Sequence, residues 1–120
     1  LVHDDQKHLL PVYVEASLLH PKSAEYVDGA AFHWYSGDHF DVVDSMHRLH
    51  PELLLLASEA TYEKRMWEEG RDKAYPDWRF GEGYAHDIIG DLNAGAVGWI
   101  DWNLLLDKSG GPNHVGNVCD

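Results

Sequence analysis

The sequence predicts a layered α/β fold with parallel strands, and two kinds of segment support this prediction. Three apolar segments without helical periodicity, at residues 26–35, 53–57 and 96–102, are typical of strands buried on both faces. Segments with helical periodicity lie between them. Because strands that alternate with crossover helices pair in parallel with right-handed connections, the alternation predicts a parallel sheet covered by helices.

The first unit of the chain is a strand end followed by a helix. Leu1-Val2 is interpreted as the tail of a strand. A helix is predicted from Pro11 to about Leu19, since proline suits the first helical turn, where its missing N–H is not needed. His20-Pro21 is predicted to close this helix.

The second unit begins with the aromatic and apolar strand at residues 26–35. A short amphipathic helix follows Gly37-Asp38, and Pro51 ends its pattern. Its apolar positions recur every three to four residues: Phe40, Val43, Met46 and Leu49 or His50.

The third unit joins the strand Leu53–Ala57 to a helix and then to the strand at residues 96–102. The helix places Tyr84, Ile88 and Leu92 on one face, and Asp87 and Asp91 are expected to point away from that face. Gly95 stands at the expected helix stop.

Two architectures fit this order of elements. One is an open doubly wound sheet, which 120 residues could complete, and the other is a consecutive slice of a (β/α)8 barrel, which needs about 250 residues. A doubly wound sheet predicts a phosphate-binding loop after a strand. Gly81-Glu82-Gly83 is a weak candidate, since it follows no predicted strand and carries a carboxylate where phosphate would lie.

The charge, cysteine and histidine content of the chain limits the classes of function that fit it. Nine Lys and Arg against 21 Asp and Glu give a formal net charge of -12, which repels nucleic acid overall. The single cysteine, Cys119, cannot form an internal disulfide. No metal or cofactor is predicted. His47 and His50 stand at helical spacing with His39 nearby, but a metal site needs a third ligand held by further partners, and this helix is predicted to lie on the exterior.

Polar and aromatic side chains follow all three strands. His33-Trp34-Tyr35, Ser58-Glu59 and Asp101-Trp102-Asn103 stand at strand ends that meet at one rim of a parallel sheet. Because burial of a carboxylate costs free energy, Glu59 is either a paired structural group or a working one. The aromatic side chains either cap the core or form the flat amphipathic surface that a sugar ring requires.

Retaining glycoside hydrolysis requires two carboxylates about 5 Å apart, and Glu59 could supply only one of them. Asp101 lies one strand away between two tryptophans, and we interpret it as an orienting or sugar-hydroxyl-binding group. Asp4-Asp5 either contributes from the far side of the rim or caps the following helix.

These motifs resemble a known family. GAAFHWY, LLLLASEA, AVGWIDWNLLLD and GGPNHVGN, in this order, are similar to the second half of the catalytic barrel of glycoside hydrolase family 30, in particular the glucosylceramidases. The resemblance covers residues 1–120. It implies a partial TIM barrel that runs from the end of strand 5, at Leu1-Val2, through strand 8.

The resemblance also implies roles for individual residues. Glu59, in the SEA motif, corresponds to the nucleophile, and His33 and Tyr35 lie around it. Trp102 and Asn117 correspond to residues that line the glucose site. The family's acid/base glutamate belongs to an Asn-Glu-Pro motif that does not occur here, so the isolated chain is predicted to be a fragment without activity.

Further implications concern the parent protein. The family implies a β-glucoside or glucosylceramide-like substrate, access to a membrane lipid, and a secreted, periplasmic or lysosomal location, with a saposin-type activator in animal relatives. The alternative is a noncatalytic carbohydrate-binding or interaction fragment that shares the aromatic rim. A barrel slice also predicts exposed inward side chains in the LLLL run and at Val97, Trp99 and Asp101.

Overall fold

A computed structural model of the chain describes residues 1–62 and 78–103. Its four parallel strands are β1 (Val2–Gln6), β2 (Gly29–His33), β3 (Leu54–Glu59) and β4 (Gly98–Trp99), and they pair in the order β1-β2-β3-β4. The predicted parallel α/β arrangement is therefore confirmed. In the described part of the chain the order of strands never reverses, which favours the barrel over the doubly wound alternative.

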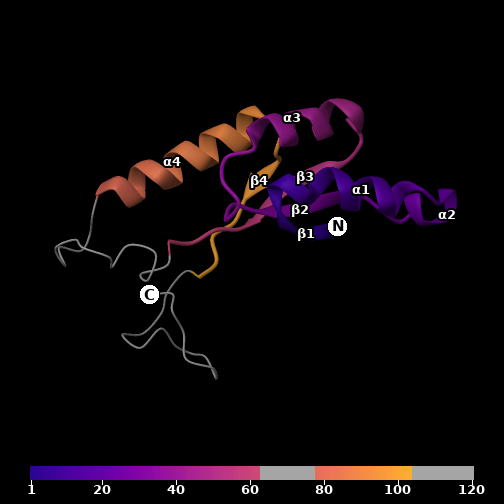
Figure 1. The fold of residues 1–120 in the computed structure, drawn as a ribbon, viewed down its shortest axis with the longest axis horizontal. Coiled ribbons are helices and arrows are strands. Elements are labelled where there is room, and N and C mark those ends of the chain that lie inside the picture. Colours follow the sequence, from indigo (N-terminus) through magenta and orange to yellow (C-terminus); the bar gives the residue numbers. More distant parts are fainter. Residues whose placement is uncertain (63–77, 104–120) are drawn as a thin grey trace, which may run out of the picture.

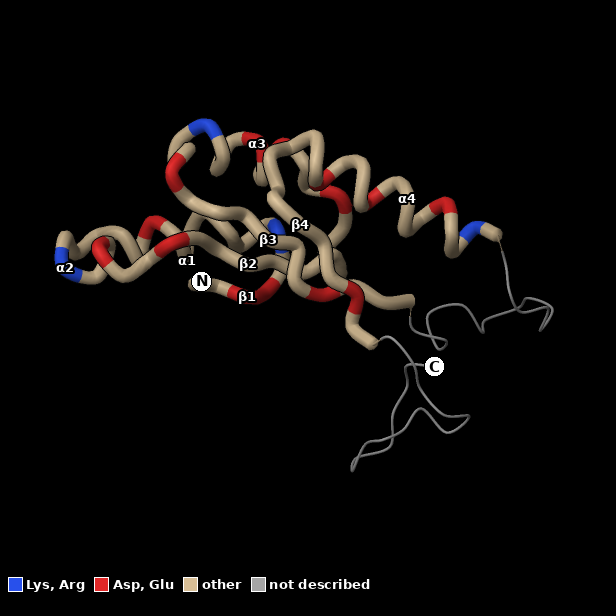
Figure 2. Tube along the Cα trace, turned by 180° about the vertical axis from the view of Figure 1, so that it is seen from behind, with Lys and Arg blue, Asp and Glu red and all other residues tan. Residues whose placement is uncertain are grey.

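The helices connect successive strands (Figure 1); α1 contacts α2 and α3, and α3 contacts α4. A short 3-10 helix, η1 (Lys7–Leu9), leads into α1 (Leu10–Leu18), and α2 (Pro21–Ala24) begins at the proline that was predicted to close α1. The amphipathic α3 (Phe40–Leu49) precedes β3, and α4 (Trp78–Asn93) precedes β4. Asp and Glu residues are distributed along the whole described trace (Figure 2), in keeping with the net charge of -12.

The core lies between the sheet and the helices. Alternate residues of β2 and β3 point toward it, and they pack against α1 and α3. The buried side chains of this layer are Leu10, Val14, Ala30, Phe32, Val43, Met46, Leu55 and Ala57. On the opposite face of the sheet Leu54 is 50% exposed, so the helices cover one face only.

Helix α4 ends as the sequence predicts. Gly95 has a φ of +103°, a conformation that favours glycine. Its N–H donates to the carbonyl of Leu92, and the N–H of Ala96 donates to the carbonyl of Asp91. These two bonds form a Schellman motif, which satisfies the last carbonyls of the helix and directs the chain into β4.

The predicted orientation of α4 is wrong in one respect. Asp87 and Asp91 were expected to face solvent, yet they are 5% and 0% exposed, while Leu92 is 48% exposed. The reason is Lys7, a fully buried ammonium whose Nζ lies 2.6 Å from Asp87 Oδ1 and 2.8 Å from Asp91 Oδ1. A hydrophobicity pattern treats aspartate as a surface residue and cannot register a buried partner 80 positions away.

Strand boundaries and faces also differ from the prediction. Asp4-Asp5 lies within β1 rather than after it. Leu54 and Val97 are exposed as expected, and the Leu53 and Leu55 side chains, which belong to the core and do not point inward, are buried.

Trp99 likewise does not point inward. Its indole Nε1 donates to Asp87 of α4, so the side chain lies on the helix side of the sheet. The physical reason is the register of β4, in which Trp99 pairs with the helix-facing Ala57 and so points to the same side of the sheet.

Candidate active site

The site is built on two irregularities in the sheet. Between β1 and β2 the register slips at Asp4, and between β2 and β3 it slips at Ser58, so each residue is an extra residue in its strand. Asp4 has a φ of +63°, in the left-handed region that non-glycine residues rarely adopt. The Ser58 bulge lies at the C-terminal end of β3, and the Asp4 bulge lies in the middle of β1.

The bulge at Ser58 determines where Glu59 points. Leu55 and Ala57 face the helices, and regular alternation would place residue 59 on the same side. Because one residue is inserted at Ser58, Glu59 instead pairs in register with His33. The imidazole Nε2 of His33 lies 3.7 Å from Glu59 Oε2, so the structure brings these two predicted site residues together.

Asp4 connects the two bulges. Its Oδ1 accepts a hydrogen bond of 2.7 Å from the Ser58 hydroxyl and lies 3.1 Å from His33 Nε2. The Ser58 hydrogen bond holds the pKa of the Asp4 carboxyl below its ordinary value. Desolvation by burial opposes this effect, and His33 adds a smaller lowering contribution to the pKa. Asp4 is therefore an ionised acceptor at neutral pH, and the sequence interpretation recognised it only as a rim or capping residue.

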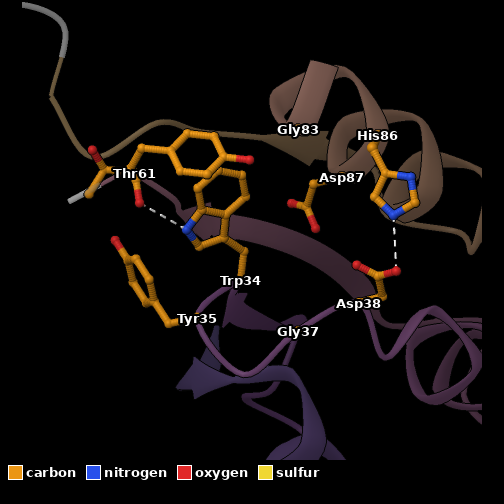
Figure 3. Close-up of a pocket in the computed structure, with 9 residues that line it drawn as sticks. Trp34, Tyr35, Gly37, Asp38, Thr61, Gly83, His86 and Asp87 are labelled. Atoms are coloured by element: carbon orange, nitrogen blue, oxygen red, sulfur yellow. Dashed lines mark hydrogen bonds and ion pairs between the residues drawn. The ribbon is translucent and has the colours of Figure 1, made fainter. Parts of the chain in front are cut away.

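An aromatic cluster follows β2 and β3. Trp34 lies nearly parallel to Tyr84, with ring centroids 5.1 Å apart, and meets Tyr62 and Trp99 edge-on. Its indole Nε1 donates to the carbonyl of Thr61 (Figure 3). The cluster thus ties the segment after β2 to the segment after β3, and both segments contribute to one pocket.

That pocket has a volume of about 250 Å³. Figure 3 shows Trp34 and Tyr35 on one side and the acidic and basic groups of Asp38, His86 and Asp87 on the other. His86 Nε2 lies 2.9 Å from Asp38 Oδ2. Thr61, Tyr62 and two glycines complete the lining.

Among the predicted site residues, Tyr35 lines this pocket. Its ring lies edge-on to His33 with centroids 6.2 Å apart, which links the pocket to the Glu59 neighbourhood.

The end of β4 carries Asp101 and Trp102. The backbone N–H of Trp102 donates to the carbonyl of Ala60, the residue after Glu59, at 2.9 Å. The Tyr84 hydroxyl lies 3.4 Å from Asp101 Oδ1. Trp102 is 49% exposed, so its indole is available beside the end of β3. Asn117, the remaining predicted site residue, lies outside the described residues.

A buried ion cluster lies between the sheet and α4, and it consists of Lys7, Asp87 and Asp91. Lys7 Nζ is also 4.8 Å from the ring centroid of Phe40. Asp87 uses one oxygen for Lys7 and the other for the Trp99 indole. Within the described residues neither Asp91 oxygen has an aligned hydrogen-bond donor, and burial raises the pKa of Asp91 to about 7. The sequence offered no signal for this cluster beyond a lysine after a strand.

The described residues hold no group of three or more His, Cys, Asp or Glu side chains placed to bind a metal ion. Among the helices of residues 1–62 and 78–103, none has the length and apolar character needed to cross a membrane.

Comparisons with known proteins identify the family of the chain. The glycosyl hydrolase family 30 TIM-barrel domain matches residues 1–120. The chain is 41% identical to the lysosomal acid glucosylceramidase of Mus musculus and 38% identical to the putative glucosylceramidase 3 of Caenorhabditis elegans. Both matches cover 100% of this chain, which spans 24% and 23% of the length of these relatives.

Two solved structures are similar in fold. SrfJ from Salmonella typhimurium has a TM-score of 0.82 at 35% identity, and the match covers 97% of this chain and 25% of that protein. The endo-β1,6-glucanase BT3312 has a TM-score of 0.68 at 25% identity, covering 96% of this chain and 26% of that protein. From its sequence match over residues 1–120 and its parallel sheet, the chain belongs to glycosyl hydrolase family 30.

Proposed function

We propose that this chain supplies the nucleophile side of the active site of a retaining β-glycosidase of the glucosylceramidase type. The observation that carries the proposal is the position of Glu59, which the Ser58 bulge places beside His33 at the C-terminal end of a parallel strand. Catalytic carboxylates of TIM barrels lie at this end of the strands. The family membership supports hydrolysis of a glycosidic bond as the reaction.

In the proposed arrangement residues 1–120 form the C-terminal half of the barrel, with β1 to β4 as barrel strands 5 to 8. The acid/base carboxylate then comes from a strand that this chain does not contain. Closing the barrel would cover the exposed inner face at Leu54, because the missing strands would complete the ring. Glu59 would face the centre of the rim, where a substrate is bound from several strand ends.

The reaction would proceed in two displacements. The Glu59 carboxylate attacks the anomeric carbon while the acid carboxyl protonates the leaving oxygen, and a covalent glycosyl-enzyme forms. The same acid group then acts as a base, and water releases the sugar with retained configuration. His33 and Tyr35 would surround the nucleophile, while Asp101, Trp102 and Asn117 would hold the sugar.

The proposed substrate is a β-glucoside, with glucosylceramide as the specific candidate because several relatives are named glucosylceramidases. A membrane lipid would then be the source of substrate. A lysosomal or secreted location is proposed on the same ground, since one relative is named a lysosomal enzyme. A saposin-type activator would act only if the parent were an animal lysosomal protein.

The test is Glu59→Gln in the complete protein that contains this chain. Turnover of an aryl β-glucoside should be abolished, since an amide neither attacks nor carries charge, while binding of glucose should persist. A mechanism-based fluoroglucoside should label Glu59 in the wild type. Glu52→Gln is the matched control, because Glu52 precedes the opposite end of β3 and its side chain is 67% exposed.

Two results would refute this assignment: labelling at another residue, or full activity in Glu59→Gln. The 120 residues alone should show no hydrolysis above background, since loss of general acid catalysis alone costs about 10²- to 10⁴-fold. A complete protein that binds β-glucosides without turning them over would instead be a carbohydrate-binding protein.

A further inference from the structure

We propose that Asp4 is a positioning residue, whose carboxylate holds Ser58 and His33 and thereby fixes the direction of Glu59. The inference rests on the proposed function, since it takes Glu59 as the nucleophile. It adds a role for a residue on the first strand, two strands away from the carboxylate that it controls. Asp4 need not contact the sugar for this role.

The first step of the argument is that the direction of Glu59 depends on one inserted residue. Without the bulge at Ser58, residue 59 would follow Leu55 and Ala57 onto the helix side of the sheet. A bulge leaves its extra residue outside the regular ladder, so something else must hold it. The Ser58 side chain is held by Asp4 Oδ1 at 2.7 Å, with the carbonyl of Phe32 a more distant acceptor at 3.3 Å.

The second step concerns Asp4 itself, whose backbone is in the left-handed region at a φ of +63°. Aspartate tolerates this conformation better than most residues, but it remains unfavourable compared with extended backbone. A strand adopts such a conformation only when surrounding contacts favour it, and these positions cluster at functional sites. Here the bulge lets the Asp4 side chain reach across β2 to Ser58 on β3.

The third step concerns His33, whose Nε2 lies between two carboxylates. The distance is 3.1 Å to Asp4 Oδ1 and 3.7 Å to Glu59 Oε2. An ionised carboxylate only accepts hydrogen bonds, so the contact with Asp4 requires a proton on Nε2. Asp4 therefore keeps this N–H directed chiefly at itself. Glu59 Oε2 lies near the positive edge of the imidazole but receives no hydrogen bond from it.

Stability does not account for this network. The Asp4 side chain is 68% exposed, and exposed ion pairs and hydrogen bonds contribute little to folding free energy. Two side chains from separate strands nevertheless converge on one of its oxygens. Their common effect is to order the backbone and the imidazole directly beside Glu59.

The experiment compares Asp4→Ala with Asp5→Ala in the complete protein. Asp5 is the matched control, because it is the neighbouring exposed aspartate and its Oδ1 accepts from the adjacent N–H of Gln6. The readouts are the rate at which a fluoroglucoside labels Glu59, and kcat and KM for an aryl β-glucoside. Asp4→Ala should lower the labelling rate and kcat by about 10- to 100-fold, because small misplacement of a reacting group has effects of this size.

KM should stay close to the wild-type value in Asp4→Ala, and Asp5→Ala should match the wild type in every readout. Asp4→Asn, which keeps an oxygen for Ser58, should restore part of the lost rate. Ser58→Ala should reproduce the loss, and the double variant Asp4→Ala/Ser58→Ala should be no slower than the slower single variant, since both changes remove the same hydrogen bond. Ser58→Ala also decides the question if Asp4→Ala fails to fold.

Three outcomes overturn the inference: labelling of Asp4→Ala at the wild-type rate, equal losses in Asp4→Ala and Asp5→Ala, or a raised KM at unchanged kcat, which would mean that Asp4 binds sugar. These outcomes differ from failure of the proposed function. If the wild-type protein is not labelled at Glu59, the nucleophile assignment fails first and the role of Asp4 fails with it.

Discussion

Lys7 and Asp87 are 80 positions apart in the chain, and their charged atoms lie 2.6 Å apart between the sheet and helix α4. The contact fixes α4 to the segment that follows β1. The Asp87 carboxylate also accepts a hydrogen bond from the Trp99 indole, so it holds the side chain of this β4 residue as well. Fold stability and the position of the aromatic cluster therefore depend on one buried ion cluster.

Lys7→Met should be strongly destabilising. It removes the only cation from contact with two buried carboxylates in the described structure, and an unpaired buried charge typically costs about 3–5 kcal/mol. Denaturant unfolding of the complete protein measures the change. Lys22→Met is the control, because Lys22 is an exposed residue of α2, and it should leave the free energy of unfolding nearly unchanged. Equal effects from both variants would show that the cluster contributes no stability.

Asp91→Asn should alter the pH dependence of stability. Burial raises the pKa of Asp91 from 3.8 to about 7, and the nearby Lys7 only partly opposes this effect. The folded protein therefore binds more protons than the unfolded chain between about pH 4 and pH 7, so this group makes stability fall as pH rises through that window. In Asp91→Asn the free energy of unfolding should fall less steeply as pH rises. Unfolding free energies at pH 5 and pH 8 measure it, and an unchanged slope would contradict the pKa assignment.

Two glycines of α4 should respond oppositely to alanine. A Cβ at Gly90 would collide with the Phe40 ring, whereas a Cβ at Gly81 would meet nothing within 4 Å. Alanine is favoured over glycine in helices by about 1 kcal/mol, and overpacking costs about 1–3 kcal/mol. Gly81→Ala should therefore raise the thermal unfolding midpoint and Gly90→Ala should lower it. A rise in both would show that α3 and α4 are not closely packed at Phe40.

Ser58→Ala should raise the pKa of Asp4. The Ser58 hydroxyl is the largest cause of the lowered Asp4 pKa, so its removal should return the carboxyl toward its ordinary value. Titration of the side-chain carboxyl carbon by NMR measures the change, with Asp4→Asn to assign the signal. Ser17→Ala is the control, since Ser17 bonds to Tyr13 within α1, and it should leave the titration unchanged. An unchanged Asp4 titration in Ser58→Ala would argue against the hydrogen bond between the bulges.

The order of elements was predictable because it depends on local patterns. Three patterns involve only neighbouring residues. The LLLL run corresponds to a strand in the structure, the amphipathic spacing before Pro51 to a helix, and the stop at Gly95 to a helix cap. Glu59 was identifiable as a candidate because it directly follows an apolar strand.

The arrangement around Glu59 was not predictable by the same means. A bulge at Ser58 reverses the expected face of the following residue, and no period-two pattern contains that information. The burial of Asp91 depends on Lys7, a partner distant in the sequence. Sequence periodicity can assign a residue to an element, but irregular strand register and buried ion pairs are set by tertiary contacts.

The β1-β2-β3-β4 arrangement also implies an order of assembly. Each strand pairs with the strand made immediately before it, so during synthesis the sheet can grow by addition at one edge, without waiting for distant segments. The bond between Ser58 and Asp4 becomes available once β3 emerges, ahead of α4 and β4. The contact that orders the backbone beside Glu59 can therefore form before the helix that buries Lys7 has emerged from the ribosome.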